Sequence, residues 1–391
     1  MDEPFSSTPS LFFGGPPEWV ERWLGLIKPD ARHTAWRAFL TMVVGWAPLA
    51  VLAFADGHLL REGDPRGSFL LDLAAYARFL IAAPLFIICE ALCLPRLNQI
   101  AQHFLKAGLV LTADRARYDE AVNSTRRYLN AKWAEIGAIV LSYAIILYSV
   151  YVLPDVAAWQ ASALHGRRTL SLAGWWYIGV SGPLFLVLLL GWLWRVLLWG
   201  RFLWLMSRLN LKLLPSHPDL VGGLRFVGTS IGAFVPLAFA MGTTLAGPIA
   251  NQVVYEGHSL LTFRYSVAVL VVVVLFLFVG PVMVFNGPLV RARRVGIFNY
   301  GALAGSLGQQ FEQKWLSPDK KIDKEALQVQ DFSATVDLYG VVSNVRQMKI
   351  TPIDRSGLIV LALAVLLPFL PVVLTVLPLR DLLKEVATLL L

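Results

Sequence analysis

Charged side chains are scarce in this chain of 391 residues. Asp, Glu, Lys and Arg together make up 15% of the sequence, whereas soluble domains contain roughly 25%. Hydrophobic residues make up 57%, so a water-soluble fold of this composition would expose extensive apolar patches, which soluble monomers rarely do. The shortage of charge therefore excludes an ordinary soluble fold and indicates an integral membrane protein.

Cysteine is almost absent as well. The two cysteines, Cys89 and Cys93, lie four residues apart in one apolar stretch. That spacing does not suit a disulfide, so we predict no oxidised framework. Together with Glu90 they form only a weak metal cluster, and we interpret them as packing residues. The N-terminal residues MDEPFSSTPS contain no basic region before an apolar core, so we expect no cleaved signal peptide.

Sequence signatures of catalysis are also missing. The motifs GxSxG and HExxH, a Walker loop and paired CxxC motifs do not occur. We therefore predict no catalytic residues, no cofactor and no metal. The net charge of +8 would suit a nucleic acid, but the basic residues flank apolar stretches. This placement favours contact with anionic lipid, and we expect no nucleic-acid partner.

Seven long apolar stretches dominate what is present. A helix needs about 20 apolar residues to cross a bilayer, and the continuous runs do not alternate as the strands of a membrane β-barrel do. We predict an all-α bundle of seven transmembrane helices, at Trp36–Ala55, Phe69–Leu94, Trp133–Leu153, Gly174–Trp199, Phe226–Ala250, Tyr265–Phe285 and Ser356–Leu377.

The connections between these stretches alternate between rich and poor in basic residues. If arginines near a span end are counted with the adjacent connection, alternate connections hold four, seven, five and ten Lys and Arg residues. The others hold two, two, one and two. Basic connections stay in the cytoplasm, so we predict a cytoplasmic N-terminus and an external C-terminus.

The chain divides accordingly into four regions. Residues 1–35 form a cytoplasmic N-terminal segment with an interfacial helix, and residues 36–287 form a six-helix core with helical cytoplasmic loops at 95–132 and 200–223. Residues 288–355 are a cytoplasmic helical segment, interrupted by the polar turn Ser317–Lys324, and these cytoplasmic pieces form a small layer. Residues 356–391 hold the seventh span and an outer interfacial tail, Leu379–Leu391.

Arg78 is the one basic residue deep inside a predicted span. It lies about 13 Å into the second span, where a charge is costly unless it faces protein or water. Asp72, six residues earlier, is expected to point elsewhere, since six residues rotate a regular helix by roughly 240°. Three interpretations remain open: a structural arginine bonded to backbone carbonyls, a site on an anion pathway, or a snorkelling side chain.

Charged residues also gather near the cytoplasmic ends of spans two to four. Glu90, Glu135 and Arg195 favour interhelical ion pairs, although a ring of such charges in an oligomer is an alternative selectivity gate. In the turn that follows the fourth span, Asp219 is expected to cap the fifth helix by accepting from Val221 or Gly222. With His217 it is a weaker candidate for metal or proton chemistry.

The fifth span is rich in small and hydroxyl residues. Gly228 and Gly232 form a GxxxG packing motif, and four hydroxyl residues allow the alternative of a pore-lining helix. Gly280-Pro281 and Asn286-Gly287-Pro288 are expected to break the sixth span, as in transport sites. The candidate solute pathway therefore consists of Arg78, Thr229, Ser230, Thr243, Thr244 and Asn286.

Several short strings resemble a family of bacterial polytopic inner-membrane proteins with no known activity. The resemblance covers most of the chain and implies a multi-pass location in the bacterial plasma membrane. It implies no ligand or catalytic residue. The strings are Gly174-Trp175-Trp176-Tyr177, Ser181-x-Pro183-Leu184-Phe185, Arg201-Phe202-Leu203-Trp204 and His217-Pro218-Asp219-x-x-Gly222-Gly223-Leu224.

Three functions fit these observations. The leading hypothesis is a channel or transporter for a small, anionic solute, with the bilayer as partner and homo-oligomers compatible with the glycine-rich helix faces. The second is a membrane-embedded enzyme acting on a lipid head group, with His217 and Asp219 as acid and base and with Arg201 and Arg208 holding phosphate. The third is a non-catalytic scaffold.

Overall fold

The computed structural model describes residues 14–15, 34–61, 63–152, 157, 159–164, 167–316 and 331–376 of the protein. This part of the chain is mostly helical, and β1 (Ala161–Leu164) and β2 (Arg167–Leu170) pair as one small antiparallel hairpin. The expected interfacial tail at 379–391, the polar turn Ser317–Lys324 and most of the N-terminal segment 1–35 lie outside the described residues.

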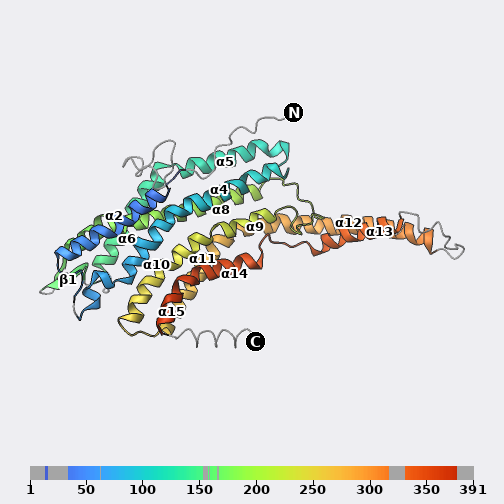
Figure 1. Ribbon diagram of the computed structural model, residues 1–391. Helices are drawn as coiled ribbons and strands as arrows, with labels where there is room; N and C mark the ends of the chain where they lie inside the picture. The colour runs from blue at the N-terminus through green and yellow to red at the C-terminus, as the bar shows by residue number, and fades with distance from the viewer. Residues whose placement is uncertain are drawn as a thin grey trace.

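The described chain contains seven helices that are long and apolar enough to cross a membrane, which confirms the predicted seven-span architecture. Figure 1 shows them side by side in one elongated bundle. The protein is therefore a multi-pass membrane protein in contact with a lipid bilayer. The spans are Thr34–Ala55, Leu73–Lys106, Lys132–Tyr151, Leu172–Ser207, Arg225–Val254, Leu260–Trp315 and Arg355–Thr375.

Only the first and third spans are single regular helices, α2 (Thr34–Ala55) and α6 (Lys132–Tyr151). Each of the other spans is divided by an irregular turn. They comprise α3 (Leu73–Ala75), η3 (Tyr76–Ala82) and α4 (Ala83–Lys106); α7 (Leu172–Trp176), η5 (Tyr177–Ser181) and α8 (Gly182–Ser207); α9 (Arg225–Ala233) and α10 (Val235–Val254); η6 (Leu260–Phe263), α11 (Arg264–Val279), η7 (Gly280–Phe285) and α12 (Asn286–Trp315); and α14 (Arg355–Leu366), η9 (Leu367–Phe369) and α15 (Leu370–Val376).

Prolines account for the two π-helical turns, η3 and η5. Pro84 and Pro183 each follow one of these turns by two residues. A proline has no backbone N–H to donate to the residue four positions earlier, and its ring crowds that carbonyl. In η3 the hydrogen-bond pattern therefore changes from four to five residues. The N–H of Ala83 donates to the carbonyl of Arg78, five residues earlier.

The sixth span differs from its prediction at Gly280-Pro281 and Asn286-Gly287-Pro288. The helix does not break there. Residues Gly280–Phe285 tighten into a 3₁₀ turn, and the chain continues as one rod to Trp315. Pro281 lies at the start of the 3₁₀ turn, where the missing N–H of a proline is tolerated.

Small residues of the fifth span bring backbones into direct contact. A Cβ on Gly228 would collide with the carbonyl of Pro352, and a Cβ on Gly242 would collide with that of Val365. Gly247 packs in the same way against the chain at Leu73–Ala77. The second and seventh spans therefore hold the fifth between them, as its composition predicts. Gly232 is the exception, since no atom lies within 4 Å of its Cβ position.

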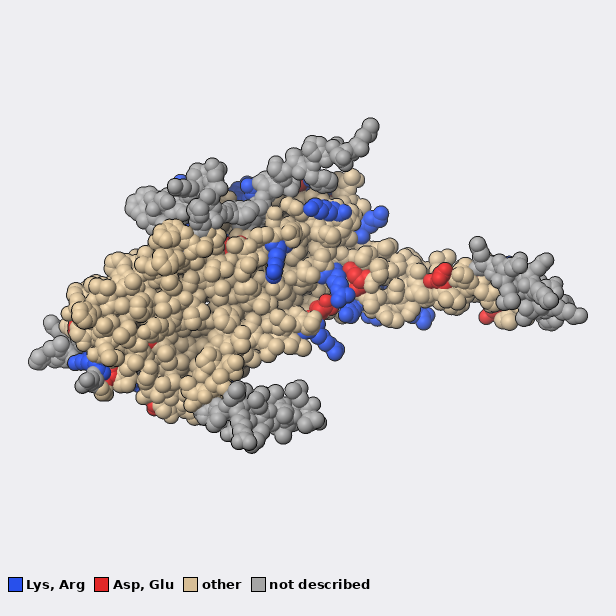
Figure 2. All heavy atoms as spheres, in the orientation of Figure 1, with Lys and Arg blue, Asp and Glu red and all other residues tan. Residues whose placement is uncertain are grey.

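One end of the bundle carries most of the basic residues, and we call it the basic side. The ends of α4 and α8 meet α5 (Arg115–Leu129) there, and the hydroxyl of Tyr118 on α5 donates to the carbonyl of Ala101 at 2.9 Å. Burial raises the pKa of Tyr118 to about 12. Lys and Arg side chains gather at this end in Figure 2, whereas the middle of the bundle is nearly free of charge on that face.

The last basic-side element is a helical hairpin of α12 and α13 (Asp331–Gln347). Its root is fixed to the bundle where Gly296 packs against Pro215 and Val345, and where Arg293 Nη2 donates to the carbonyl of Arg346 at 3.1 Å. Beyond this root the hairpin projects away from the bundle (Figure 1). The predicted helical layer on the basic side thus consists of a compact part around α5 and the projecting hairpin.

The predicted helical loop at 200–223 is wrong beyond Ser207, where α8 ends. The following segment is drawn out of helical conformation by contacts with the chain that precedes α5. The backbone N–H of Asn210 donates to Asp114 Oδ2 at 3.0 Å, and that of Lys212 donates to the carbonyl of Leu109 at 2.8 Å. These hydrogen bonds between distant segments of the chain replace those of a helix, and they leave no periodic pattern in the sequence.

The two ends of the bundle should differ in accessibility from outside the cell. Ser306 on the projecting hairpin and Ser259 at the opposite end are both exposed. We expect a membrane-impermeant maleimide added to intact cells to label Ser259→Cys, and to label Ser306→Cys only after permeabilisation. The native Cys89 and Cys93 are buried and should give little background. Labelling of Ser306→Cys in intact cells would reverse the predicted orientation.

Candidate functional site

A polar cavity of about 620 Å³ opens at the side opposite the basic side, and we call it the Arg78 cavity. Six stretches of the chain enclose it: the connection after α2, the start of the second span, the end of α6, the connection before β1, η5 and the end of α10. Its lining residues are Pro65, Arg66, Leu71, Asp72, Ala74, Arg78, Ser149, Val150, Ala157, Trp159, Gln160, Tyr177, Pro248, Asn251, Gln252, Tyr255, Glu256 and His258.

Both π-helical turns contribute to the Arg78 cavity. Arg78 belongs to η3 and Tyr177 is the first residue of η5. A π turn rotates the side chains that follow it away from the positions of a regular helix, and such turns occur frequently at functional sites. The prolines Pro84 and Pro183 therefore act on the cavity indirectly, because they create the turns from which its polar groups project.

Arg78 is a partly exposed cation with most of its hydrogen-bonding capacity unused. Its Nη1 donates to the hydroxyl of Tyr177 at 3.5 Å, which is long for a hydrogen bond. Within the described residues, no carboxylate forms an ion pair with this guanidinium. Because the uncompensated charge faces the cavity, its partner must be water or a solute that enters from the open side.

Asp72 lines the same cavity, and the prediction that it points elsewhere is wrong. The helix begins only at Leu73, and Asp72 is its N-cap. The rotation expected of a continuous regular helix therefore does not apply. Oδ1 of Asp72 accepts from the N–H groups of Ala74 and Ala75, at 2.9 and 3.3 Å, and from Asn251 Nδ2 at 2.7 Å.

The second oxygen of Asp72 is bonded too, since Oδ2 accepts from Trp159 Nε1 at 2.9 Å. Four donors thus surround this carboxylate, which is only 9% exposed. These four hydrogen bonds occupy both carboxylate oxygens and leave little capacity for a ligand. Asp72 consequently joins the second span to α10 and to Trp159, and serves the cavity as a structural residue.

The mouth of the Arg78 cavity is crossed by an ion pair. Arg66 Nη2 lies 2.6 Å from Glu256 Oε1, and His258 Nδ1 lies 3.9 Å from Glu256 Oε2. Arg66 is 63% exposed, so solvent screens this pair and it contributes little stability. The formal charges of Arg66 and Glu256 cancel. Among the described residues that line the cavity, Arg78 is therefore the charged residue with the most unused N–H donors.

Toward the basic side the bundle is filled by packed aromatic residues. Phe79, Phe86 and Trp192 are 1% exposed or less, and Trp192 Nε1 donates to the carbonyl of Phe86 at 2.8 Å. Phe185 packs edge to face against Phe79 and lies 5.9 Å from Phe86, measured between ring centroids. The Arg78 cavity is therefore open at one end and closed at the other by this aromatic layer.

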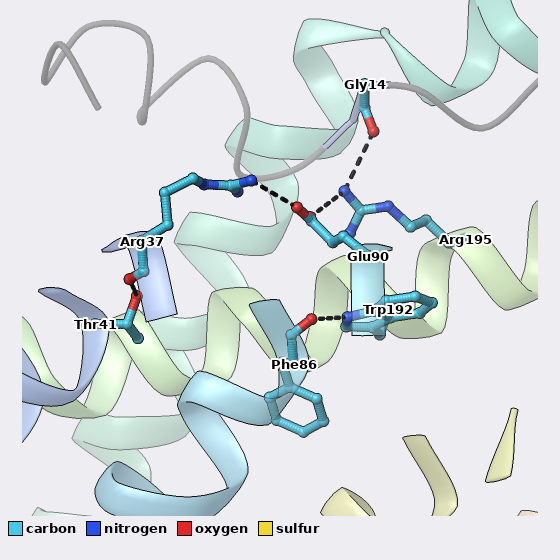
Figure 3. Close-up of polar contacts among 7 residues, drawn as sticks. All are labelled: Gly14, Arg37, Thr41, Phe86, Glu90, Trp192 and Arg195. Carbon is cyan, nitrogen blue, oxygen red and sulfur yellow. Dashed lines mark hydrogen bonds and ion pairs between the residues drawn. The ribbon is translucent and has the colours of Figure 1, made fainter. Parts of the chain in front are cut away.

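Beyond the aromatic layer lies a buried charge network (Figure 3). Glu90 on α4 accepts from two arginines. Arg37 Nη1 of α2 lies 2.9 Å from Glu90 Oε2, and Arg195 Nη2 of α8 lies 2.9 Å from Glu90 Oε1. Arg195 Nη2 also donates to the carbonyl of Gly14 at 3.2 Å. The network ties three spans and the N-terminal segment together on the basic side.

This network confirms the predicted ion pair of Glu90 with Arg195 and adds Arg37, which sequence reasoning missed. Arg37 was counted with the N-terminal segment, although it lies within the first span and is 7% exposed. Glu135 is also buried, in the first turn of α6.

Arg201 has a separate role. Its Nη1 donates to Ser124 Oγ at 3.2 Å and to Thr125 Oγ1 at 3.4 Å, and the guanidinium lies 4.8 Å from the ring centroid of Tyr128. All three partners belong to α5, so this arginine attaches α5 to α8.

The predicted cap is found only in part: Leu224 is the N-cap residue of α9, and Asp219 accepts from amides of the preceding turn and from that of Arg225, the first residue of α9. Oδ1 accepts from Val221 at 2.8 Å and from Gly223 at 3.1 Å, and Oδ2 accepts from Arg225 at 3.2 Å. Val221 is therefore confirmed, whereas Gly222 is not among the donors. His217 Nδ1 lies 2.8 Å from Asp219 Oδ1.

The environment of Asp219 shifts its titration. Burial alone would raise the pKa of this carboxyl, but the three backbone hydrogen bonds and the contact with His217 hold the pKa below its ordinary value. Nearby, Leu220 adopts a left-handed conformation with φ of 58°, which costs energy in a residue with a side chain. Its carbonyl accepts from Lys349 at 2.7 Å, which joins the turn to the segment after α13.

The hydroxyl residues of the fifth span do not line the Arg78 cavity. Each donates to a carbonyl of its own helix: Thr229 to Phe226 and Ser230 to Val227, at 2.6 and 2.7 Å, and Thr243 to Phe239 and Thr244 to Met241, at 2.9 and 2.7 Å. Such back-bonding satisfies a hydroxyl within the helix itself. The cavity is lined instead by the last turns of α10, from Pro248 onward.

Asn286 lies at the start of α12, away from the Arg78 cavity. Its buried Oδ1 accepts no hydrogen bond from the described residues. Across those same residues, no three His, Cys, Asp or Glu side chains come together in a way that would hold a metal ion.

Comparisons with known proteins add no relative: no protein-family model, no curated protein and no solved structure matches this chain. The membrane bundle and its cavity are therefore the basis on which a function is proposed.

Removal of the Glu90 charge should strongly destabilise the bundle. In Glu90→Gln, two buried guanidinium groups lose their shared carboxylate, a change that costs roughly 3–5 kcal/mol for buried ion pairs. Thermal unfolding of purified protein in detergent, followed by circular dichroism, should show a much lower midpoint.

Two further variants control this experiment. Adding Arg195→Met to Glu90→Gln should recover part of the loss, because it removes one of the two cations that lost the carboxylate of Glu90. Glu120→Gln on the exposed face of α5 should leave the midpoint unchanged. An unaltered midpoint for Glu90→Gln would contradict the structural role of the network.

Two replacements of Asp219 should show how much its hydrogen bonds to backbone amides stabilise the protein. Asp219→Ala removes all three and should cost about 1–2 kcal/mol of stability. Asp219→Asn should cost less, since an amide oxygen can still accept from Val221 and Gly223. The exposed Asp337→Ala is the matched control. A total loss of activity in well-folded Asp219→Asn would instead assign this residue a functional role.

The same capping contribution should depend on pH. A carboxyl whose folded pKa is lowered contributes stability that is present above its ordinary value of 3.8 and is lost as pH falls through the lowered value. The unfolding midpoints of the wild-type protein and Asp219→Ala should therefore converge as the solution is acidified below pH 3.8. A constant difference between them would contradict the assignment.

Proposed function

We propose that the protein is a transporter for a small anion, which it binds in the Arg78 cavity. The observation that carries this proposal is the guanidinium of Arg78, which no carboxylate of the described residues pairs with and which lines a polar cavity open to one side of the membrane. A cation in this position attracts anions and repels cations, and the other charged lining groups are engaged with protein partners. We further propose that the membrane is the bacterial plasma membrane.

The closed end of the cavity favours a carrier over a simple pore. A channel requires a continuous path, whereas here the aromatic layer of Phe79, Phe86, Phe185 and Trp192 separates the cavity from the basic side. Below that layer the Glu90 network holds α2, α4 and α8 together. A carrier exposes its site to one side at a time, and a site between interrupted helices near mid-membrane is common in such proteins.

In this proposal the residues of the cavity have distinct tasks. Arg78 pairs with the negative charge of the solute, and the adjacent hydroxyl of Tyr177 offers a hydrogen bond to the same group. Asn251 and Trp159 are occupied with Asp72 and keep the cavity wall in place. The Arg66–Glu256 pair lies at the entrance, where its exposed position allows it to separate at little cost.

The enzyme alternative receives less support. The residues that it requires, His217 and Asp219, are engaged in the turn before α9. The phosphate-holding role suggested for Arg201 and Arg208 conflicts with their contacts, since Arg201 binds α5 and the guanidinium of Arg208 lies 4.7 Å from the ring centroid of Trp204.

Flux measurements on the purified protein in liposomes test the proposal. The wild-type protein should mediate uptake of at least one anion from a panel of chloride, nitrate, sulfate and acetate. Arg78→Met should reduce that uptake at least tenfold, because an anion would then enter a low-dielectric cavity without a counter-charge. Arg78→Lys, which keeps the charge, should retain part of it.

The matched control is Arg61→Gln. Arg61 lies near the cavity mouth, 55% exposed and 3.9 Å from Asp64, but does not line the cavity. Its replacement should leave uptake unchanged. Folded Arg78→Met protein with unaltered rate and selectivity would overturn the proposal, and so would wild-type protein that moves none of these anions.

A further inference from the structure

A second depression lies on the basic side, between α4 and α9, and we call it the α4–α9 groove. It measures about 440 Å³ and is separate from the Arg78 cavity in its lining residues. Four of its lining residues are polar and four are apolar or glycine. They are Arg96, Gln99, His103 and Thr229, and Ile100, Phe226, Gly232 and Ala233.

The polar residues of α4 face the groove as one row. Arg96, Gln99 and His103 are separated by three and four residues, so they lie on the same face of the helix. All three are exposed. Arg96 forms no ion pair with the described residues, and no acidic residue lines the groove. Within the described residues, the row therefore presents donor groups that no carboxylate pairs with.

The groove lies at the depth of the lipid head groups. Arg96 follows directly after the apolar run that ends at Leu94, and α9 begins at Arg225, one turn before Thr229. Polar residues at the end of an apolar span lie at the interface between hydrocarbon and water. The head groups of the basic-side leaflet occupy the same level, next to Arg96 and His103.

The apolar end of the groove points toward the hydrocarbon. Because α4 and α9 run in opposite directions, Gly232 and Ala233 lie on the deeper side, whereas Phe226 lies beside His103, with ring centroids 4.5 Å apart. No atom comes within 4 Å of the Cβ position of Gly232. The missing side chain leaves open space at the apolar end of the groove.

We propose that the α4–α9 groove binds the phosphate head group of an anionic phospholipid from the basic-side leaflet. Arg96 and His103 contact the phosphate oxygens, and the amide of Gln99 donates a further hydrogen bond. The acyl chain lies over Gly232 and Ala233. The site does not depend on anion transport, since it shares no lining residue with the Arg78 cavity.

Native mass spectrometry of the full-length protein in detergent tests this site. Titration with phosphatidylglycerol should show at least one saturable lipid adduct with affinity at least tenfold higher than for phosphatidylcholine. Combined replacement of Arg96→Gln and His103→Gln should weaken phosphatidylglycerol binding about tenfold. Lys106→Gln, in the last turn of the same helix but outside the groove, is the matched control and should leave it unchanged.

A second variant leaves the charges intact. Gly232→Leu fills the open space and should also weaken binding of phosphatidylglycerol, which a purely electrostatic attraction to the protein surface would not explain. Inorganic phosphate should not displace the lipid.

Three results would overturn the proposal. These are equal affinity for phosphatidylcholine and phosphatidylglycerol, unchanged lipid binding in both groove variants, and displacement by inorganic phosphate at matching affinity. The last result would assign the groove to free phosphate.

Discussion

Inside a bilayer every polar atom must find its partner within the protein, because hydrocarbon offers no hydrogen bonds. The bundle satisfies this constraint at the carboxylates of Glu90 and Asp72. Glu90 is held by two arginines, and the carboxylate of Asp72 accepts four hydrogen bonds. Arg78 differs, since it has a single long contact with Tyr177. Arg78 lines a cavity, and no carboxylate of the described residues pairs with it, so its charge must be solvated from the open side.

The backbone prepares that position. Pro84 and Pro183 follow the π turns that carry Arg78 and Tyr177, and the two turns come from different spans. A regular helix would direct these side chains elsewhere. The hydrogen bond from the N–H of Ala83 to the carbonyl of Arg78, five residues earlier, is a feature of the π turn. Two spans therefore have irregular backbone hydrogen bonding beside Arg78. Strained backbone geometry of this kind commonly occurs at functional sites.

The sequence predicted the seven spans, the depth of Arg78, the pairing of Glu90 with Arg195 and part of the cap at Asp219, because apolar run length, charge position and local turn chemistry are encoded over short distances. It did not predict the wall of the Arg78 cavity. Trp159 and Asn251 reach Asp72 across 87 and 179 residues of sequence, and no periodicity records such contacts. The hydroxyls of the fifth span were assigned to a pathway from composition alone, whereas helical geometry lets each of them bond its own backbone.

The second span is the element that both ends of the bundle share. Near its start, Asp72 joins it to α10 and Trp159, and near its basic end, Glu90 joins it to α2 and α8. The π turn lies between these anchors, and Arg78 in it is about 18 Å from Glu90 along the helix at 1.5 Å per residue. A carrier that turned Arg78 toward the basic side would have to preserve or replace the partners of Glu90, since buried unpaired charges are costly. Bending at the π turn meets that requirement, because it moves Arg78 while both anchors keep their bonds.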